Sequence, residues 1–383
     1  MKRIYLDYAA TTPVDKRVVK AMLPYLAENF GNTMSLHSFG QTAKLALEQS
    51  RQQVADLISA EPNEIIFTSS ATESNNLILK GIAFANKNKG NHIIISSIEH
   101  PCIVESAKWL EKQGFEITKL PVDKYGLVKP EDVKRAMKEK TILVSIIHAS
   151  NEIGTIEPIE EIGKICKEKG IYFHTDASQS FGKIPIDVNK MNIDLLTASS
   201  HKIYGPKGVG LLYVRDGIKI EPLLHGGGQE NGLRSSTVNL AAVVGFAKAC
   251  EICKKEMKAE NKRLTALRNK LIKRILKIKN SHLNGHPKKR LANNINFSFD
   301  FIEGESLVIQ LDMHGIACST GSACSSIKLE PSHVLLATGL RPEQAHGSLR
   351  ISLGRMTTKK DIEKIIKILP KIIEKIRAIS PFK

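Results

Sequence analysis

Short apolar runs alternate with stretches of helical spacing along the first part of this chain. The apolar runs lie at residues 64–68, 92–96, 115–120, 142–147, 171–174 and 195–198. Stretches of helical spacing lie at residues 16–30, 40–59, 103–113, 131–139 and 157–168. Apolar strands that alternate with helices predict an α/β fold, with a mainly parallel sheet covered on both faces. In such a sheet, a ligand site lies beyond the carboxyl ends of the strands.

Two polar residues at the ends of successive predicted strands indicate a particular chemistry. Asp176 ends one strand, and Lys202 follows the next strand, ahead of a Gly- and Pro-rich turn. A carboxylate can keep a pyridine nitrogen protonated, and a lysine can hold an aldehyde as a Schiff base, as pyridoxal phosphate chemistry requires. A lysine after a strand is more often a solvated loop charge. The neighbouring Ser199 and His201, together with the turn, favour the catalytic interpretation.

Other polar segments also lie where strands end. Residues 69–72 open a helix, and the free N–H groups at a helix start form an anion site; taken alone, an ordinary helix cap is the more common role. His100 follows a strand, where it could stack on a planar cofactor and transfer protons, although a histidine in a loop is more often exposed. Residues 226–237 are polar and too rich in glycine to be core, so they could reach an active site, including that of a neighbouring subunit.

Six cysteines occur in the chain, and we do not interpret them as a disulfide framework. Cys250 and Cys253 form a C-x-x-C pair, but they lie within a helical pattern without a second pair, which favours a structural role. Cys324 lies in a run of small polar residues that we expect to be mobile and exposed, so its thiol would be accessible, as a nucleophile requires. Cys318 follows an apolar run, and we expect it to be buried.

The pattern changes at about residue 256. A Lys/Arg-rich helix, two strands and two further helices follow, which predicts a smaller α+β domain. We divide the chain into a large domain of residues 16–255 and a small domain of residues 1–15 and 256–383, which carries the cysteine loop at about 319–329. Arg350 lies within an apolar strand of this small domain. If Arg350 faces a cleft, its guanidinium is suited to bidentate binding of a carboxylate. If its strand lies at the edge of the sheet, Arg350 would instead be a surface charge.

Composition limits the class of protein further. At 383 residues, the chain is long enough for about two domains. It contains no membrane-length apolar run, and its N-terminus lacks the apolar segment of a secretory signal, so we expect a cytoplasmic location without membrane association. The net charge is +17, with 56 Lys and Arg against 39 Asp and Glu. This excess is spread along helices without interleaved aromatic residues, which favours a solvated surface over nucleic-acid binding.

Five segments together resemble the cysteine desulfurases of the NifS/IscS type, which are class V aminotransferase-like enzymes of fold type I. These segments are YLDYAATTP at 5–13, FTSSATES at 67–74, NEIG at 151–154, HKIYGPKG at 201–208 and GSAC at 321–324. The resemblance implies pyridoxal 5′-phosphate as cofactor, a homodimer, and a large domain with a mainly parallel seven-stranded sheet beside a smaller α+β domain. The chain departs from the family pattern where Thr33 and Met34 replace a proline version of one loop, and where Ser200 and Ser236 replace glycines. Serine is tolerated there unless φ is positive.

The resemblance also implies the roles of individual residues. Lys202 carries the cofactor, His100 stacks on its ring and transfers protons, and Cys324 takes the sulfur. The cofactor would contact Ala71, Thr72, Asn151, Asp176, Gln179, Ser199, His201, Lys202 and, from the second subunit, Thr237. Asp176 would pair with the ring nitrogen, and Gln179 would contact the phenolic oxygen. The substrate carboxylate would contact Asn32, Asn151 and Arg350.

The implied reaction converts L-cysteine to L-alanine. The sulfur passes as a persulfide to Cys324 and then to an acceptor, either an Fe–S scaffold protein or another acceptor such as one for tRNA thiolation. No resident metal is implied, although Cys324 could transiently ligate a [2Fe–2S] cluster together with a scaffold partner. Selenocysteine lyase, or another fold-type I enzyme such as an aminotransferase, is the alternative activity.

Overall fold

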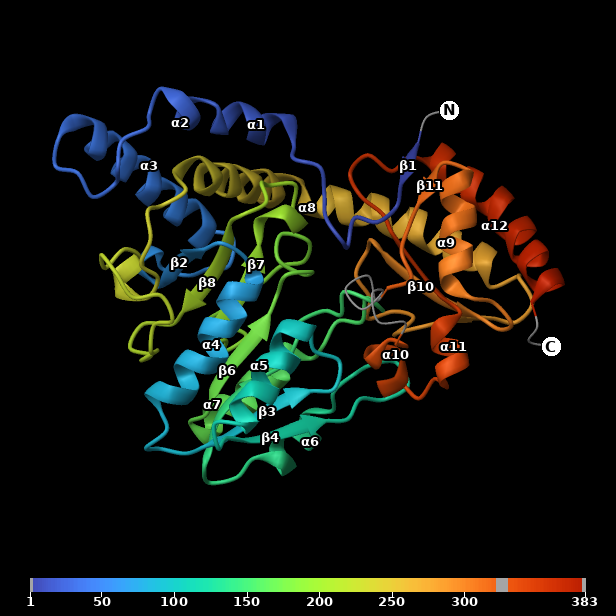
Figure 1. The fold of residues 1–383 in the computed structure, drawn as a ribbon, viewed down its shortest axis with the longest axis horizontal. Helices are drawn as coiled ribbons and strands as arrows, with labels where there is room; N and C mark the ends of the chain where they lie inside the picture. Colours follow the sequence, from blue (N-terminus) through green and yellow to red (C-terminus); the bar gives the residue numbers. More distant parts are fainter. Residues whose placement is uncertain (1–2, 322–329, 381–383) are drawn as a thin grey trace.

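A seven-stranded sheet forms the centre of the larger part of the molecule (Figure 1). The computed structural model describes residues 3–321 and 330–380. In spatial order, the strands are β2 (Ile65–Thr68), β8 (Gly210–Val214), β7 (Leu195–Ser199), β6 (Tyr172–Asp176), β5 (Thr141–Ser145), β3 (His92–Ser96) and β4 (Glu116–Leu120). Strand β8 runs antiparallel to both of its neighbours, and the other pairs are parallel. The predicted mainly parallel seven-stranded sheet is therefore confirmed.

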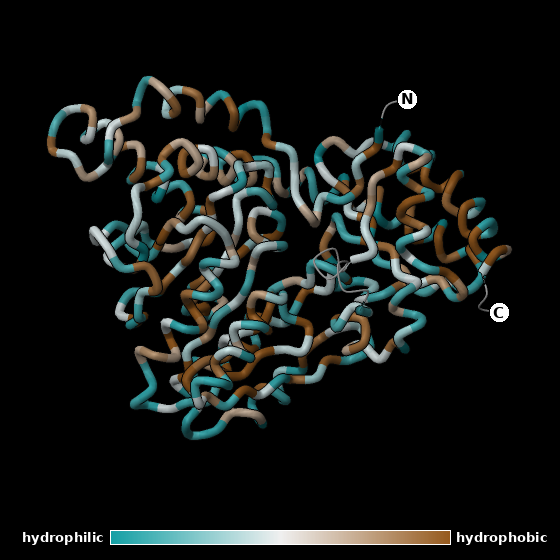
Figure 2. The backbone as a smooth tube through the Cα atoms, viewed as in Figure 1, coloured by the Kyte–Doolittle hydropathy of each residue, from teal (hydrophilic) through white to brown (hydrophobic). Residues whose placement is uncertain are grey.

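Helices cover both faces of this sheet. One face packs against a core that includes α1 (Lys16–Met22), α3 (Ser38–Ala55), α7 (Ile159–Lys169) and α8 (Leu240–Ile275). The other face packs against α4 (Ala71–Ala85) and α5 (Pro101–Glu111). Along β3, Ile94 lies in the first core, whereas Ile93 and Ile95 lie in the second. Both faces of each central strand are thus buried, which explains their continuous apolar runs, brown in Figure 2. The short helices α2 (Pro24–Ala27) and α6 (Pro130–Ala136) lie between these elements in the chain.

A second core lies in the smaller part of the molecule. It surrounds an antiparallel sheet with the order β12 (Ser348–Ser352), β10 (Asn294–Phe299), β9 (Ser281–Leu283). Helices α9 (Gly304–Met313) and α12 (Lys359–Ile379) pack into this core, and α10 (His333–Ala337) and α11 (Pro342–His346) lie nearby (Figure 1). The N-terminal strand β1 (Ile4–Tyr5) pairs in parallel with β11 (Ile316–Ala317), and Leu6 is buried in the same core.

Helix α8 belongs to both cores. Phe246 lies in the large core, whereas Leu271 lies in the small core. The division that we expected at residues 255/256 therefore falls inside one continuous helix of 36 residues. The sequence changes in charge at that point, but after Gly245 the helix contains no glycine or proline that would end it. The domain division itself stays a proposal.

Glu230 joins the polar stretch 226–237 to the large sheet. Its carboxylate accepts hydrogen bonds from Nη1 and Nη2 of Arg51, at 2.8 and 2.9 Å. It also accepts a hydrogen bond of 2.7 Å from the backbone N–H of Phe67 in β2. Both side chains of this ion pair are buried. Glu230 therefore attaches to the core a stretch that sequence composition places in solvent.

Replacing Glu230 with alanine is expected to lower the free energy of unfolding by about 3–5 kcal/mol, because it leaves the buried Arg51 guanidinium without its main partner. Urea denaturation would measure this loss. Glu48→Ala is the matched control, because the half-exposed Glu48 carboxylate lies 3.5 Å from Arg51 Nε and should contribute less than about 1 kcal/mol. Equal losses in the two variants would contradict the buried-pair explanation.

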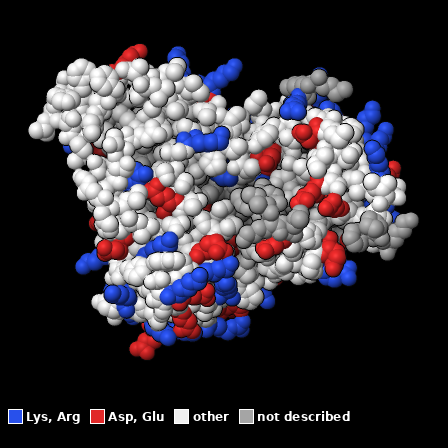
Figure 3. Space-filling view, viewed as in Figure 1, with Lys and Arg blue, Asp and Glu red and all other residues white. Residues whose placement is uncertain are grey.

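Charged residues of both signs are mixed on the face shown in Figure 3. Blue lysine and arginine side chains lie beside red aspartate and glutamate side chains. This face thus agrees with the expected solvated surface. Among the described residues, no helix has the length and apolar character needed to cross a membrane.

Candidate active site

A cleft of about 260 Å³ lies beyond the carboxyl ends of the central strands, and its walls include Asp176 of β6, Ser199 of β7 and Arg350 of β12. It brings together most of the site residues expected from the sequence. These are Ala71, Thr72, His100, Asn151, Asp176, Gln179, Ser199, His201, Lys202 and Arg350. This position follows from the parallel strands, whose carboxyl ends share one edge of the sheet.

Asp176 is held in a fixed orientation at the end of β6. Its Oδ2 accepts a hydrogen bond of 2.7 Å from Nδ2 of Asn75, and its Oδ1 accepts one of 2.9 Å from the backbone N–H of Ser178. Asn75 is fixed in turn, because its Oδ1 accepts a hydrogen bond of 2.7 Å from Oγ1 of Thr197. Asn75 was not among the predicted site residues, although an amide among the apolar residues of α4 was a usable signal; its side chain is fully buried.

Lys202 follows β7 in a short 3-10 turn, and its amine contacts the N-terminal segment. Its Nζ donates hydrogen bonds to the carbonyl oxygens of Ala9 and Ala10, at 2.7 and 2.8 Å. The backbone N–H and the hydroxyl of Thr12 both donate to the carbonyl of His201, at 3.0 and 2.9 Å. The first residues of the chain therefore form a wall of the cleft and hold the lysine, a role that was not predicted from the sequence.

The other end of the cleft suits an anion. Ser70 caps the 15-residue helix α4, with its Oγ accepting a hydrogen bond of 3.2 Å from the N–H of Glu73. Ala71 and Thr72, in the first turn, line the cleft, where helix N–H groups and the helix dipole attract negative charge. Burial and the charge of Lys202 lower the pKa of His201 to about 4, so its ring is neutral at pH 7. Residues 70–72 are thus both a helix cap and a candidate phosphate site.

His100 lines the same cleft as the N-cap of α5. Its Nδ1 accepts a hydrogen bond of 3.3 Å from the backbone N–H of Cys102 and lies 3.0 Å from the Cys102 sulfur. Burial lowers the pKa of His100, and the charge of Asp176 partly opposes that shift. With Nδ1 as an acceptor, the neutral ring carries its proton on Nε2. His333 also lines the cleft and was missed; its Nε2 donates to the carbonyl of Glu99 at 2.9 Å.

Arg350 is the charged group that the small domain brings to the cleft. Its side chain is only 3% exposed, although β12 is an edge strand, so the interpretation as a surface charge is wrong. Its Nη2 lies 2.9 Å from Oδ1 of Asp7, and its Nη1 donates to the carbonyl oxygens of Asn151 and Gly321 at 3.1 and 3.2 Å. Its buried Nε has no partner among the described residues. That nitrogen is a donor available to a ligand carboxylate.

Two expected site residues, Asn32 and Thr237, do not line this cleft. The Oδ1 of Asn32 accepts a hydrogen bond of 3.0 Å from the N–H of Met34, in the loop before α3. Thr237 is exposed, outside the cleft. Cys324 lies outside the described residues. We expected the cysteine loop to be exposed, but its first residues, 319–321, are buried or half-buried. The reason is that the backbone of Ser319 pairs with that of Arg350.

Comparisons with known proteins agree with this geometry. The sequence model of the family described as "Aminotransferase class-V" matches residues 4–365, so the chain belongs to that family. It is 56% identical over 380 residues to "Cysteine desulfurase IscS" of Methanosarcina thermophila, covering 99% of this chain and 94% of that one. It is 53% identical over 377 residues to "Cysteine desulfurase IscS 1" of Archaeoglobus fulgidus, covering 98% of each. Within the family, it is thus one of the cysteine desulfurases of the NifS/IscS type.

Solved structures agree as well. A structure titled "NIFS-LIKE PROTEIN" superimposes with a TM-score of 0.92 at 39% identity, covering 97% of this chain and 99% of that chain. A structure titled "SspA in complex with cysteine" superimposes with a TM-score of 0.81 at 39% identity, covering 91% and 98%. The fold-type I architecture expected from the sequence is therefore confirmed.

Proposed function

We propose that this protein is a pyridoxal phosphate-dependent cysteine desulfurase, which converts L-cysteine to L-alanine and passes the sulfur as a persulfide to Cys324. The observation that carries this proposal is that one cleft brings together Asp176, Lys202, the α4 N-terminus and Arg350, whose Nε has no partner among the described residues. That arrangement offers one partner for each polar part of the cofactor and one for an amino-acid carboxylate.

The chemistry of the cleft residues fits the cofactor. Asp176 is positioned to accept from a protonated ring nitrogen, and the α4 N-terminus with Ser199 and His201 is suited to the phosphate. The buried hydroxyl of Ser178, also in the cleft, has no partner among the described residues. When bound, pyridoxal phosphate supplies an electron-withdrawing ring that makes the Cα proton of an attached amino acid acidic. Lys202 would attach the cofactor and then, once released by the substrate, remove that proton.

Substrate binding would depend on Arg350. Asp7 and the carbonyl of Asn151 orient its guanidinium, which leaves Nε for the carboxylate of L-cysteine. The neutral ring of His100, with its proton on Nε2, is suited to proton transfer next to the ring of the cofactor. Asn32 and Thr237 would then act on the cleft of a partner subunit, since neither lines its own.

The properties of the other cysteines support the assignment of sulfur transfer to Cys324. Burial raises the pKa of Cys102 and of Cys318 to about 12, and that of Cys253 to about 11. Burial also raises the pKa of Cys166 and Cys250. All five described cysteines are therefore protonated near neutral pH, whereas sulfur transfer needs a thiolate. Cys318 is buried, as we expected, and the C-x-x-C pair is buried within α8, in agreement with a structural role.

A patch of exposed apolar side chains supports a homodimer. It comprises Val19, Leu23, Leu26, Phe30, Met34, Leu36, Phe39 and Leu45, with Leu36 92% exposed. These residues lie on α1, α2, α3 and their connections, where Figure 2 shows brown segments along the outer edge. Large contiguous apolar patches mark interaction surfaces. Asn32 lies within this same stretch of chain, so a partner seated on the patch would bring it near a second cleft.

Thr237→Ala is therefore expected to weaken cofactor retention by about fivefold, the effect of losing one hydrogen bond. The visible absorbance that remains after dialysis would measure this loss. Light scattering at micromolar concentration should show a dimer for both proteins. A monomer that keeps its full cofactor content would show that each cleft is complete without a partner.

The reaction itself is tested with the purified protein. It should show the visible absorption band of bound cofactor, and with L-cysteine and a thiol reductant it should release alanine and sulfide in equal amounts. Alanine without sulfide, or no turnover of L-cysteine beside rapid turnover of selenocysteine, would instead support a different fold-type I activity. We also propose an Fe–S scaffold protein as the sulfur acceptor, in line with the IscS-type relatives, and a cytoplasmic location.

A further inference from the structure

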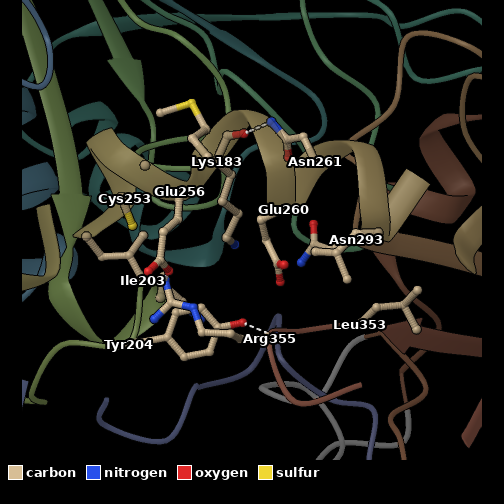
Figure 4. Close-up of a pocket in the computed structure, with 14 residues that line it drawn as sticks. Lys183, Ile203, Tyr204, Cys253, Glu256, Glu260, Asn261, Asn293, Leu353 and Arg355 are labelled. Atoms are coloured by element: carbon tan, nitrogen blue, oxygen red, sulfur yellow. Dashed lines mark hydrogen bonds and ion pairs between the residues drawn. The ribbon is translucent and has the colours of Figure 1, made fainter. Parts of the chain in front are cut away.

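A second lysine lies behind the cofactor cleft. Lys183 comes four residues after Gln179, and its Nζ donates a hydrogen bond of 3.2 Å to Oε1 of Gln179. Its side chain points into a separate cavity of about 40 Å³, which Lys202 also lines and which α8 closes on one side (Figure 4). This cavity has room for a water molecule but not for a substrate. Lys183 thus reaches the site through Gln179 rather than through the cofactor cleft.

The hydrogen bond from Lys183 determines which way the Gln179 amide faces. A lysine ammonium has three donors and no acceptor, so only the amide oxygen can face it. The NH2 group of Gln179 then faces away from Lys183, and its Nε2 donates a hydrogen bond of 2.9 Å to the carbonyl of Ala9. The second N–H of this amide is left for another acceptor, and Gln179 lines the cofactor cleft. If the amide turned over, its oxygen would face the carbonyl of Ala9.

The charges around Lys183 leave it without a carboxylate partner. Glu256 and Glu260 line the cavity, but Glu256 pairs with Arg17 at 2.6 Å, and Glu260 pairs with Arg263 at 2.8 Å. No ion pair of Lys183 occurs among the described residues. Burial, followed by the charge of Lys202, lowers the pKa of Lys183 to about 7. As an ammonium, Lys183 can only donate, so it fixes the amide most strictly below this pKa; as a neutral amine, it can still donate to Oε1 of Gln179.

We propose that Lys183 is a positioning residue, which holds the Gln179 amide so that its NH2 group donates to an oxygen of the ligand in the cleft. The identity of that oxygen, the phenolic oxygen of pyridoxal phosphate, rests on the proposed function. Lys183 also places a third cationic group near Lys202 and Arg350.

Lys183→Met and Lys183→Arg test this role, with the exposed Lys219→Met as the matched control. In a crystal structure of cofactor-free Lys183→Met, the Gln179 amide should rotate about its remaining hydrogen bond to the carbonyl of Ala9, because Oε1 has lost its donor. In the loaded protein, the dissociation constant for pyridoxal phosphate should rise about fivefold. The pH at which the visible absorption band changes should also rise, because both a donor to the phenolic oxygen and a nearby cation are lost. Lys183→Arg should restore part of each effect, and Lys219→Met should behave like the wild type.

A double-mutant cycle separates positioning from general damage to the fold. If Lys183 acts through the amide, Lys183→Met should have little further effect on cofactor affinity in a Gln179→Ala background. An undiminished effect in that background would overturn the proposal. So would an unchanged orientation of the Gln179 amide plane in the cofactor-free variant, even if thermal stability were lowered. If the wild type bound no pyridoxal phosphate, the proposed function would fail, and the cofactor-free crystal structures alone would decide the role of Lys183.

Discussion

Lys202→Ala is expected to lower the turnover of L-cysteine by about a thousandfold or more, since it removes both the attachment of the cofactor and the base for the Cα proton. Lys202 lines the cleft together with Asp176 and the first turn of α4, and no other lysine lines the cleft among the described residues. Lys183 contributes only to the separate cavity. No other described lysine is therefore placed to attach the cofactor or to act as the base in this variant.

Borohydride reduction followed by peptide mapping would locate the attachment site. In the wild type, the pyridoxyl group should be found on Lys202, and in the variant no lysine should be labelled. Lys219→Ala, at an exposed position, should keep the wild-type turnover. Labelling of Lys183 in the wild type would reverse the roles that we assign to the two lysines.

Cys324→Ser should retain the cofactor and still bind L-cysteine, because Lys202, Asp176 and Arg350 are unchanged. Its release of alanine with sulfur transfer should fall at least about a hundredfold, since a hydroxyl is a far weaker nucleophile towards sulfur than a thiolate. The measurements are the alanine yield and the mapping of alkylated persulfides by mass spectrometry.

Cys318→Ser is the matched control for this variant. Cys318 lies near the same loop, but burial keeps its thiol protonated, so its loss should leave the persulfide yield unchanged. Cys102 is the more demanding comparison, because it lines the cleft itself. A persulfide on Cys102 or Cys318, or near-normal turnover by Cys324→Ser, would contradict the assignment of Cys324.

Much of the large sheet could be predicted because each central strand is buried on both faces and therefore forms an uninterrupted apolar run. Strand β8 was not predicted. It follows a Gly- and Pro-rich turn and pairs antiparallel between β2 and β7, an order set by contacts distant in the sequence. The continuity of α8 was missed because a change from apolar to basic composition resembles a boundary, although it does not interrupt a helix. The two serines in place of family glycines, Ser200 and Ser236, do not have positive φ and are tolerated.

In the site, Asp176 and Lys202 could be predicted because they follow strands, and strand ends converge. Their supporting residues could not, because these depend on how distant segments pack. Asn75 contacts Asp176 across 101 positions of sequence, and Asp7 contacts Arg350 across 343. Lys183 gave no signal of its own, since a lysine after a helical turn is ordinarily a solvated charge. Its role emerges only from the hydrogen bond to Gln179.

The unbroken length of α8 has a mechanical consequence. At 1.5 Å per residue, its 36 residues make a rod of about 54 Å, embedded at one end in each core. Rotating one core against the other would require bending this rod, and after Gly245, which lies in the large-core half, the helix has no glycine or proline at which it would kink. The distance between Lys202, on one side, and Arg350, on the other, is thereby kept nearly constant. The cleft therefore keeps one width, which selects for the spacing between the amino and carboxylate groups of an α-amino acid. Discrimination among amino-acid substrates must then come from the residues that contact the substrate side chain.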